Sequence, residues 1–91
     1  MPTYLIGYDL DKPAQDYEDL IAKLKSYGSW WHCLDSTWLI KTDKTHVVVR
    51  DELKALMGAN DKLLVINVTG RERAWTGFAQ RCADWLRRQD F

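Results

Sequence analysis

The stretch YLIGYDLDKP, residues 4–13, decides how the fold of this chain begins. Five of its first seven residues carry large apolar or aromatic side chains, which predicts a strand that enters a core. Because strand side chains alternate between the two faces of a sheet, Asp9 and Asp11 would share a face if the strand continued that far. Two such carboxylates either cap the turn after the strand or hold a divalent metal ion.

The chain of 91 residues is predicted to form a single domain over residues 1–91. It contains no apolar run of about 18 residues, so we expect no membrane span. We also expect no signal peptide, because a strand pattern begins at once, and therefore a cytoplasmic protein. Cys33 and Cys82 lie far apart without a CxxC motif. In a chain without an export signal they are predicted to be reduced thiols.

The formal net charge is zero, since 13 Lys and Arg balance 13 Asp and Glu. This balance removes the usual electrostatic footprint of a nucleic-acid-binding protein. Five arginines nevertheless lie toward the end of the chain. They form either a solvated helix face or a phosphate-binding patch, and they are Arg71, Arg73, Arg81, Arg87 and Arg88.

Hydrophobic periodicity predicts alternating strands and helices along the chain. Period-two and β-branched or aromatic segments indicate strands at 3–10, 29–34, 37–42 and 62–69. Helical spacing indicates a helix over 17–27 closed by Gly28, a second helix capped by Thr42 or Asp43 and broken at Gly58, and a third over 75–88. In the second helix the predicted buried face is Val49, Leu53, Leu56 and Met57.

This order predicts an α+β protein with the ferredoxin-like βαββαβ pattern and one added C-terminal helix. Two helices of that fold cover one face of a four-stranded antiparallel sheet. Trp30 and Trp31 are neighbours in a strand and therefore point to opposite faces. At least one of them lies on the second face, which either the third helix or a second subunit would shield.

The polar residues of the strands and turns each have an ordinary structural interpretation. His32 is expected to be a packed or hydrogen-bonded strand histidine, and it points away from the face that Cys33 occupies. Ser36 lies in the turn of the predicted hairpin and either stabilises that turn or binds a phosphate or water beside Asp9. No nucleotide-binding loop, nucleophile elbow or HExxH motif is present.

The strand ending in Tyr8-Asp9-Leu10, the helix closed by Gly28 and the hairpin LDSTW over residues 34–38 together resemble the CRISPR-associated protein 2 family. The runs YDLDKPAQDYEDL and SWWHCLDSTWLI resemble small SinR-like relatives, and VapD-type toxins are similar more distantly. This resemblance covers roughly residues 3–70. It implies a ferredoxin-like homodimer in which the aspartate that ends the first strand faces its mate and binds a divalent ion.

On this resemblance the metal-binding aspartate corresponds to Asp9, the hairpin serine to Ser36, and the aromatic residue two positions later to Trp38. Two features depart from the family. The loop after Asp9 lacks its arginines, and the chain ends in the predicted helix 75–88 where many members have a strand that pairs across the dimer.

Two functions follow as hypotheses. The preferred one is a non-catalytic dimeric module that binds a protein or a nucleic acid through its aromatic sheet face. The alternative is a Mg²⁺-dependent endonuclease that hydrolyses RNA or DNA phosphodiester bonds. In that enzyme Asp9 would bind the ion, with Asp11 and Ser36 in support, and the metal would activate water and neutralise phosphate charge.

Overall fold

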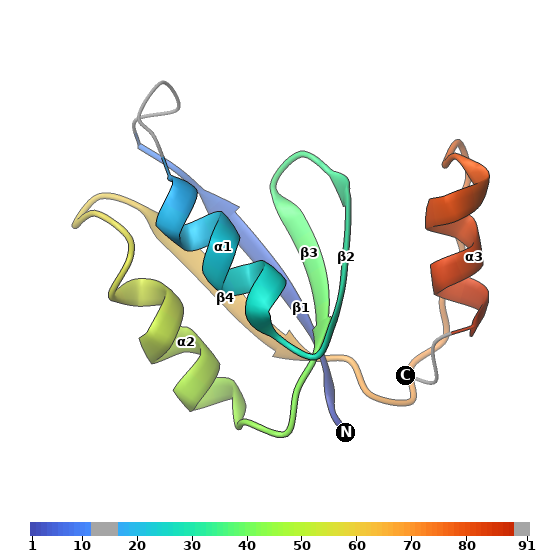
Figure 1. Cartoon of the computed structure of the whole chain (residues 1–91), viewed down its shortest axis with the longest axis horizontal. Coiled ribbons are helices and arrows are strands. Elements are labelled where there is room, and N and C mark those ends of the chain that lie inside the picture. Colours follow the sequence, from blue (N-terminus) through green and yellow to red (C-terminus); the bar gives the residue numbers. More distant parts are fainter. Residues whose placement is uncertain (12–16, 89–91) are drawn as a thin grey trace.

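The computed structural model describes residues 1–11 and 17–88, which form a four-stranded antiparallel sheet and three helices (Figure 1). No helix in these ranges is both long and apolar enough to cross a membrane. The elements in chain order are β1 (Thr3–Asp9), α1 (Glu18–Ser26), β2 (Ser29–Leu34), β3 (Thr37–Lys41), α2 (His46–Lys54), β4 (Lys62–Asn67) and α3 (Gln80–Arg88).

The sheet has the strand order β2-β3-β1-β4, and each pair of neighbours is antiparallel. β1 is therefore an inner strand, with Leu5 opposite Leu39 of β3 on one side and Ile66 of β4 on the other. β3 lies between β1 and β2, and β1 lies between β3 and β4. The small α+β architecture with an antiparallel sheet agrees with the sequence prediction.

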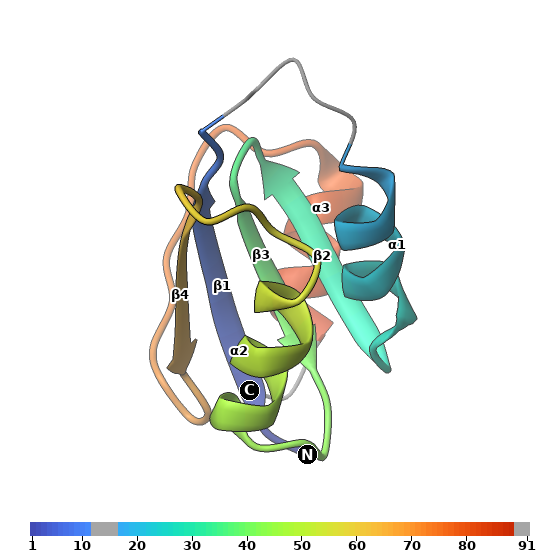
Figure 2. The same ribbon diagram turned by 90° about the vertical axis from the view of Figure 1, so that its left-hand side faces the viewer.

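Helices α1 and α2 cover one face of the sheet, and Figure 2 shows them in front of it. Alternate residues of β1, Tyr4 and Ile6, point toward them and are buried. This first core also contains Leu20 and Leu24 of α1, Val49 and Leu53 of α2, and Tyr27, Trp38 and Ile40. The helical spacing of these apolar residues is the pattern from which both helices were predicted.

Helix α3 covers part of the opposite face and lies behind the sheet in Figure 2. Trp31 and Leu39 of the sheet are buried together with Leu86 of α3, and Leu5 packs against the same cluster. The indole Nε1–H of Trp31 donates to the carbonyl oxygen of Cys82 at 3.1 Å. Of the two shields considered for the aromatic residue on this face, the third helix is therefore the one that the structure contains.

The predicted helix over 75–88 is too long at its beginning, since α3 starts at Gln80. Gly77 has φ of 84°, a left-handed conformation that a right-handed helix cannot include. Trp75 and Phe78 still pack into the second core, but from an irregular connector over residues 68–79. Their apolar spacing continued the helical period although the backbone there is not helical.

Smaller differences concern α2. Its N-cap is Thr45, and neither Thr42 nor Asp43 has this role. The Thr45 Oγ1 accepts a hydrogen bond from the backbone N–H of Val48 at 3.2 Å. Leu56 was expected on the buried face, but it follows the end of the helix and is 36% exposed.

The prediction that Cys33 and Cys82 are reduced thiols is wrong for this structure, in which they form a disulfide between β2 and α3. Their Cα atoms are 6.4 Å apart although 49 positions separate them in the chain. The packing of α3 on the sheet creates this proximity, which the spacing in the sequence does not reveal. The bond connects α3 covalently to β2.

We expect the double variant Cys33→Ser, Cys82→Ser to unfold at a lower urea concentration than the wild type. A cross-link that closes a loop of this length constrains the unfolded chain and contributes up to about 4 kcal/mol to the free energy of unfolding. Dithiothreitol should lower the urea midpoint of the wild type to that of the variant and leave the variant unchanged. Equal midpoints for the oxidised wild type and the variant would contradict the prediction.

Candidate functional site

Asp9 is the last residue of β1 and is exposed. It lies opposite Lys62, the first residue of β4. The alternation of side chains along β1 places Asp9 on the same face of the sheet as Leu5. The carboxylate therefore stands at the end of the sheet, on the face that carries α3.

Ser36 lies beside this strand end, in the turn between β2 and β3. Its carbonyl oxygen accepts a hydrogen bond from the backbone N–H of Tyr8 at 3.1 Å. Because Tyr8 directly precedes Asp9, the antiparallel pairing of β1 with β3 brings the two predicted site residues Asp9 and Ser36 to neighbouring backbone positions. This is the one pairing of predicted site residues that the backbone hydrogen bonds support.

Asp11 belongs to a different set of contacts. β1 ends at Asp9, so the condition under which Asp9 and Asp11 share a face is not met. The backbone N–H of Asp11 donates to Oδ1 of Asp61 at 2.7 Å. The other carboxylate oxygen of Asp61 accepts from the N–H of Gly58 at 2.7 Å, and the Tyr17 hydroxyl also donates to this carboxylate. Asp61 therefore connects the chain after β1 to the loop before β4.

Trp38, the residue that the resemblance places near the site, is fully buried. Its indole Nε1–H donates to the hydroxyl oxygen of Tyr8 at 3.1 Å. The His32 ring stacks on it with ring centroids 3.9 Å apart, and His32 Nε2–H donates to the carbonyl oxygen of Asp35 at 3.1 Å. Trp38 therefore supports the hairpin from within the core, and His32 is the packed, hydrogen-bonded residue expected from the sequence.

The site offers the exposed carboxylate of Asp9 at the strand end, and the serine turn beside it carries a second exposed carboxylate, Asp35. Within residues 1–11 and 17–88, no three His, Cys, Asp or Glu side chains gather in a group that could hold a metal ion. Mg²⁺ is commonly held by one or two carboxylates with several waters, so a single Asp9 corresponds to the minimal form of such a site. A second carboxylate for such an ion would come from Asp35 of the same turn or from a second copy of the chain.

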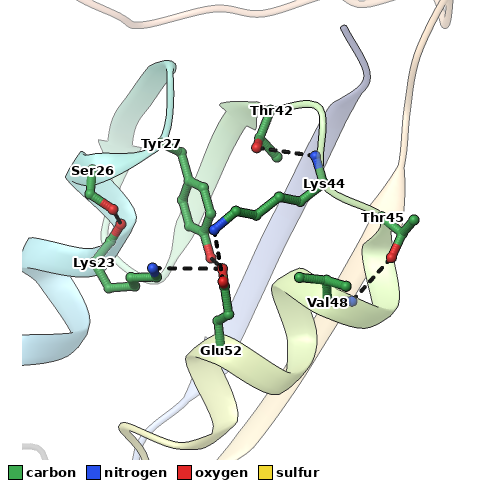
Figure 3. A network of polar contacts seen from close by, with 8 residues as sticks. All are labelled: Lys23, Ser26, Tyr27, Thr42, Lys44, Thr45, Val48 and Glu52. Carbon is green, nitrogen blue, oxygen red and sulfur yellow. Dashed lines mark hydrogen bonds and ion pairs between the residues drawn. The ribbon is translucent and has the colours of Figure 1, made fainter.

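A separate polar network lies at the ends of α1 and α2, and Figure 3 shows its side chains converging on Glu52. Lys44 Nζ donates to Glu52 Oε2 at 2.7 Å, and the Tyr27 hydroxyl donates to Glu52 Oε1 at 2.8 Å. Lys23 Nζ lies 3.7 Å from the same Oε1. The network therefore connects α1, the chain after β3 and α2.

These contacts shift the protonation of the two central groups in opposite directions. The hydrogen bond from Lys44 lowers the pKa of the Glu52 carboxyl, with further lowering from Tyr27 and Lys23, against a smaller opposing effect of burial. Burial raises the pKa of the Tyr27 hydroxyl, and the hydrogen bond to Glu52 raises it further. The carboxylate is thus held ionised and the phenol neutral, which is the arrangement of a structural anchor.

Sequence reasoning missed both Asp61 and Glu52. Asp61 follows Gly58 in a turn-rich segment, and an aspartate there often accepts backbone hydrogen bonds, so a local signal was present. Glu52 carries no such signal. Its partners Tyr27 and Lys23 lie more than twenty positions away in the sequence, and only the packing of α1 beside α2 brings them together.

We expect Glu52→Gln to lower the melting temperature at pH 7. The loss of the charge-assisted contacts should cost about 1 kcal/mol, or roughly 4–8 °C for a chain of this size. Because the folded pKa of Glu52 lies below the unfolded value, its contribution is complete above the unfolded pKa and disappears as the pH falls through the folded pKa. The difference from wild type should therefore shrink in acid.

Thermal melts of both proteins from pH 7 to pH 3 measure this dependence. Glu72→Gln is the matched control, because it removes a carboxylate from an exposed position on the connector. A difference between Glu52→Gln and wild type that stays constant over the whole pH range would show that the ionised carboxylate has no special role.

Comparison of the chain with family models, with curated proteins and with solved structures finds no match.

Proposed function

We propose that this protein is a non-catalytic, ferredoxin-like binding module that pairs with a second copy of itself through the edge of β4. The partner is another protein chain, because the zero net charge offers no general attraction for nucleic acid. The resemblance of residues 3–70 to the CRISPR-associated protein 2 family, in which homodimers are expected, agrees with this proposal.

The connectivity supports the ferredoxin-like assignment. Helix α1 joins β1 to β2, and β3 lies between these two strands. Helix α2 joins β3 to β4, and β1 lies between those two strands. Two such split βαβ units, with both helices on one face, form the ferredoxin-like pattern. The helix α3 on the other face is the addition expected from the sequence.

The observation that carries the dimer is that β4, a strand at the edge of the sheet, also exposes two large apolar side chains. Leu64 is 55% exposed and Ile66 is 44% exposed, both on the face of the sheet that α3 covers only in part. The aromatic residue expected on that face, Trp31, is buried under α3, so the aromatic surface assumed from the sequence is closed. In our proposal, Leu64 and Ile66 of β4 form the apolar surface that binds the second copy, instead of the aromatic surface.

β4 is better suited to pairing than β2, the other edge of the sheet. β2 shows a register irregularity between Trp31 and Leu34, and such irregularities protect strand edges from further pairing. The pairing of β4 with β1 is regular over six residues, from Asn67 to Lys62. An isologous antiparallel contact between two β4 strands, centred on Val65, would extend the sheet across the dimer and place Leu64 of each copy opposite Ile66 of the other.

Light scattering at micromolar concentration should give a mass of twice the 10.7 kDa of the single chain. We expect Leu64→Glu to shift the protein to the monomer, because each glutamate would then place a charge against the apolar Ile66 of the other copy. Leu56→Glu is the matched control, since Leu56 is also exposed but lies after α2, and it should remain dimeric.

A wild-type mass near that of the single chain would overturn the proposed dimer. A dimer that persists in Leu64→Glu would show that the two copies do not pair through β4.

The alternative function, a Mg²⁺-dependent endonuclease, is favoured by one observation. The exposed carboxylate of Asp9 and the turn serine Ser36 occupy neighbouring backbone positions, as the resemblance implies. Such an enzyme would need the Asp9 of a second copy nearby. Two carboxylates that share one ion lie within about 5–6 Å, because each metal–oxygen bond is about 2.1 Å.

The β4 dimer and this shared ion exclude each other. Asp9 lies beside Lys62, at the beginning of β4, and an antiparallel partner places its own Lys62 at the opposite end of the strand pair. Three strand spacings across the sheet and about six residues along it separate the two Asp9 backbones by about 25 Å. One ion cannot bridge this distance, so the oligomeric contact decides between the two functions.

For the proposed module we expect Asp9→Asn and wild type to melt at equal temperatures, with and without about 10 mM Mg²⁺. An ion bound by the native protein alone would stabilise only the wild type, by RT ln(1 + [L]/Kd). Asparagine keeps the shape of the side chain and its capping ability while removing the charge. Asp43→Asn, at an exposed position in the loop after β3, controls for a general effect of lost charge. Stabilisation by Mg²⁺ that Asp9→Asn abolishes would favour the endonuclease.

A further inference from the structure

A cavity of about 310 Å³ lies between α3, the connector and the sheet. Leu5 and Leu39 of the sheet contribute to its lining, as do Phe78 of the connector and Leu86 of α3. The connector and α3 leave part of this face of the sheet uncovered, since Leu64 and Ile66 of β4 are exposed on it. The volume is at the lower end of the range found for small-molecule sites, roughly 300–1,000 Å³.

The walls of this cavity are held in place by specific contacts. The rings of Trp31 and Phe78 meet edge to face with centroids 5.1 Å apart. The guanidinium carbon of Arg87 lies 5.5 Å from the centre of the Trp75 ring. The disulfide between Cys33 and Cys82 fixes α3 to the sheet. The cavity is therefore formed by anchored elements and does not need a ligand to order its walls.

The lining combines an apolar interior with a charged rim. Arg71, Glu72 and Arg73 all line the cavity and are all exposed. Their formal charges add to one positive charge at a rim above apolar side chains. The backbone turn that places Arg71 is fixed by Gly70, with φ of 75°, and by the Arg71 N–H, which donates to the Val68 carbonyl at 3.1 Å. An apolar body with one anionic group complements this arrangement.

We propose that the cavity under α3 binds a small amphiphile that has an apolar chain or ring system and a single anionic head group. The apolar part lies between Leu39 and Phe78, and the head group lies at Arg71. The lining of this site contains no residue of β4 and not Asp9, although Leu5 of the lining lies opposite Ile66. The site therefore adds a ligand-binding activity that neither candidate function includes.

The probe is 8-anilinonaphthalene-1-sulfonate, which has an aromatic body and one sulfonate. Fluorescence titration of the oxidised full chain should show one probe per chain. Decanoate should displace the probe at lower concentration than decanol, which has the same chain with a neutral head. Equal displacement by the two competitors would overturn the role of the anionic group.

Two variant pairs locate the site. Ala74 lines the cavity and is exposed, so Ala74→Trp should fill the space without disturbing the fold and should weaken probe binding by at least roughly tenfold. Ala59→Trp, at an exposed alanine outside the cavity, should bind as wild type does.

Arg71→Gln should weaken binding by roughly two- to fivefold. Arg81→Gln, at an exposed arginine of α3 outside the lining, should not.

Leu64→Glu separates this site from the β4 surface. We expect the variant to bind the probe as wild type does, although it is expected to be monomeric. Loss of the probe in Leu64→Glu, or unchanged binding by an Ala74→Trp protein whose melting temperature equals that of wild type, would overturn the cavity as the binding site.

Discussion

The structure depends on β1 being apolar on both of its faces. Tyr4 and Ile6 point toward α1 and α2, and Leu5 points toward α3. β1 is paired with a strand on both sides, so its backbone hydrogen-bonding groups are satisfied within the sheet. Its apolar side chains on the two faces are what other elements must cover. Two covering layers are therefore required, and the second one explains why a helix follows the four strands. The burial of apolar area on both faces is the main favourable contribution available to so short a chain.

The second layer is less complete than the first. Helix α3 reaches the β2 half of the sheet, where Trp31 is buried, while Leu64 and Ile66 of β4 remain exposed. The irregular connector between β4 and α3 supplies Trp75 and Phe78 to the second core. A covalent bond from Cys82 to Cys33 adds to the noncovalent packing of this layer. Helix α3 and the connector together do not cover this whole face of the sheet. The exposed side chains of β4 and the cavity beneath the connector both result from this incomplete coverage.

The exposed β4 strand, the cavity and the strand end at Asp9 suit different kinds of ligand. The exposed β4 edge is continuous with the sheet and presents backbone groups in a regular row, which suits another strand. The cavity is concave, apolar and bounded by charged side chains, which suits a small molecule. The strand end at Asp9 offers an exposed carboxylate beside the turn that holds Ser36. In our proposal, the contact between two copies of the chain decides which of the two candidate functions this carboxylate can serve.

The sequence by itself determined the alternation of elements, since period-two and period-3.6 patterns are local properties. The bounds of β2 agree with the prediction, and β1 and β3 each differ from it by one residue. The strand position of Asp9 and the turn position of Ser36 were readable in the same way. The start of α3 was not, because Trp75 and Phe78 continue the helical spacing while Gly77 interrupts the helix. The cytoplasmic location expected from the sequence stays a prediction.

The tertiary structure alone decided which distant residues meet. The bond between Cys33 and Cys82, the convergence of Tyr27, Lys44 and Lys23 on Glu52, and the contact of Asp61 with Asp11 join residues that are far apart in the chain or on different elements. These contacts follow from the packing of α3 on the sheet, from the packing of α1 beside α2 and from the pairing of β1 with β4, all of which depend on the whole core. A local pattern fixes the direction of a side chain within its element, but only the packed elements determine what that side chain touches.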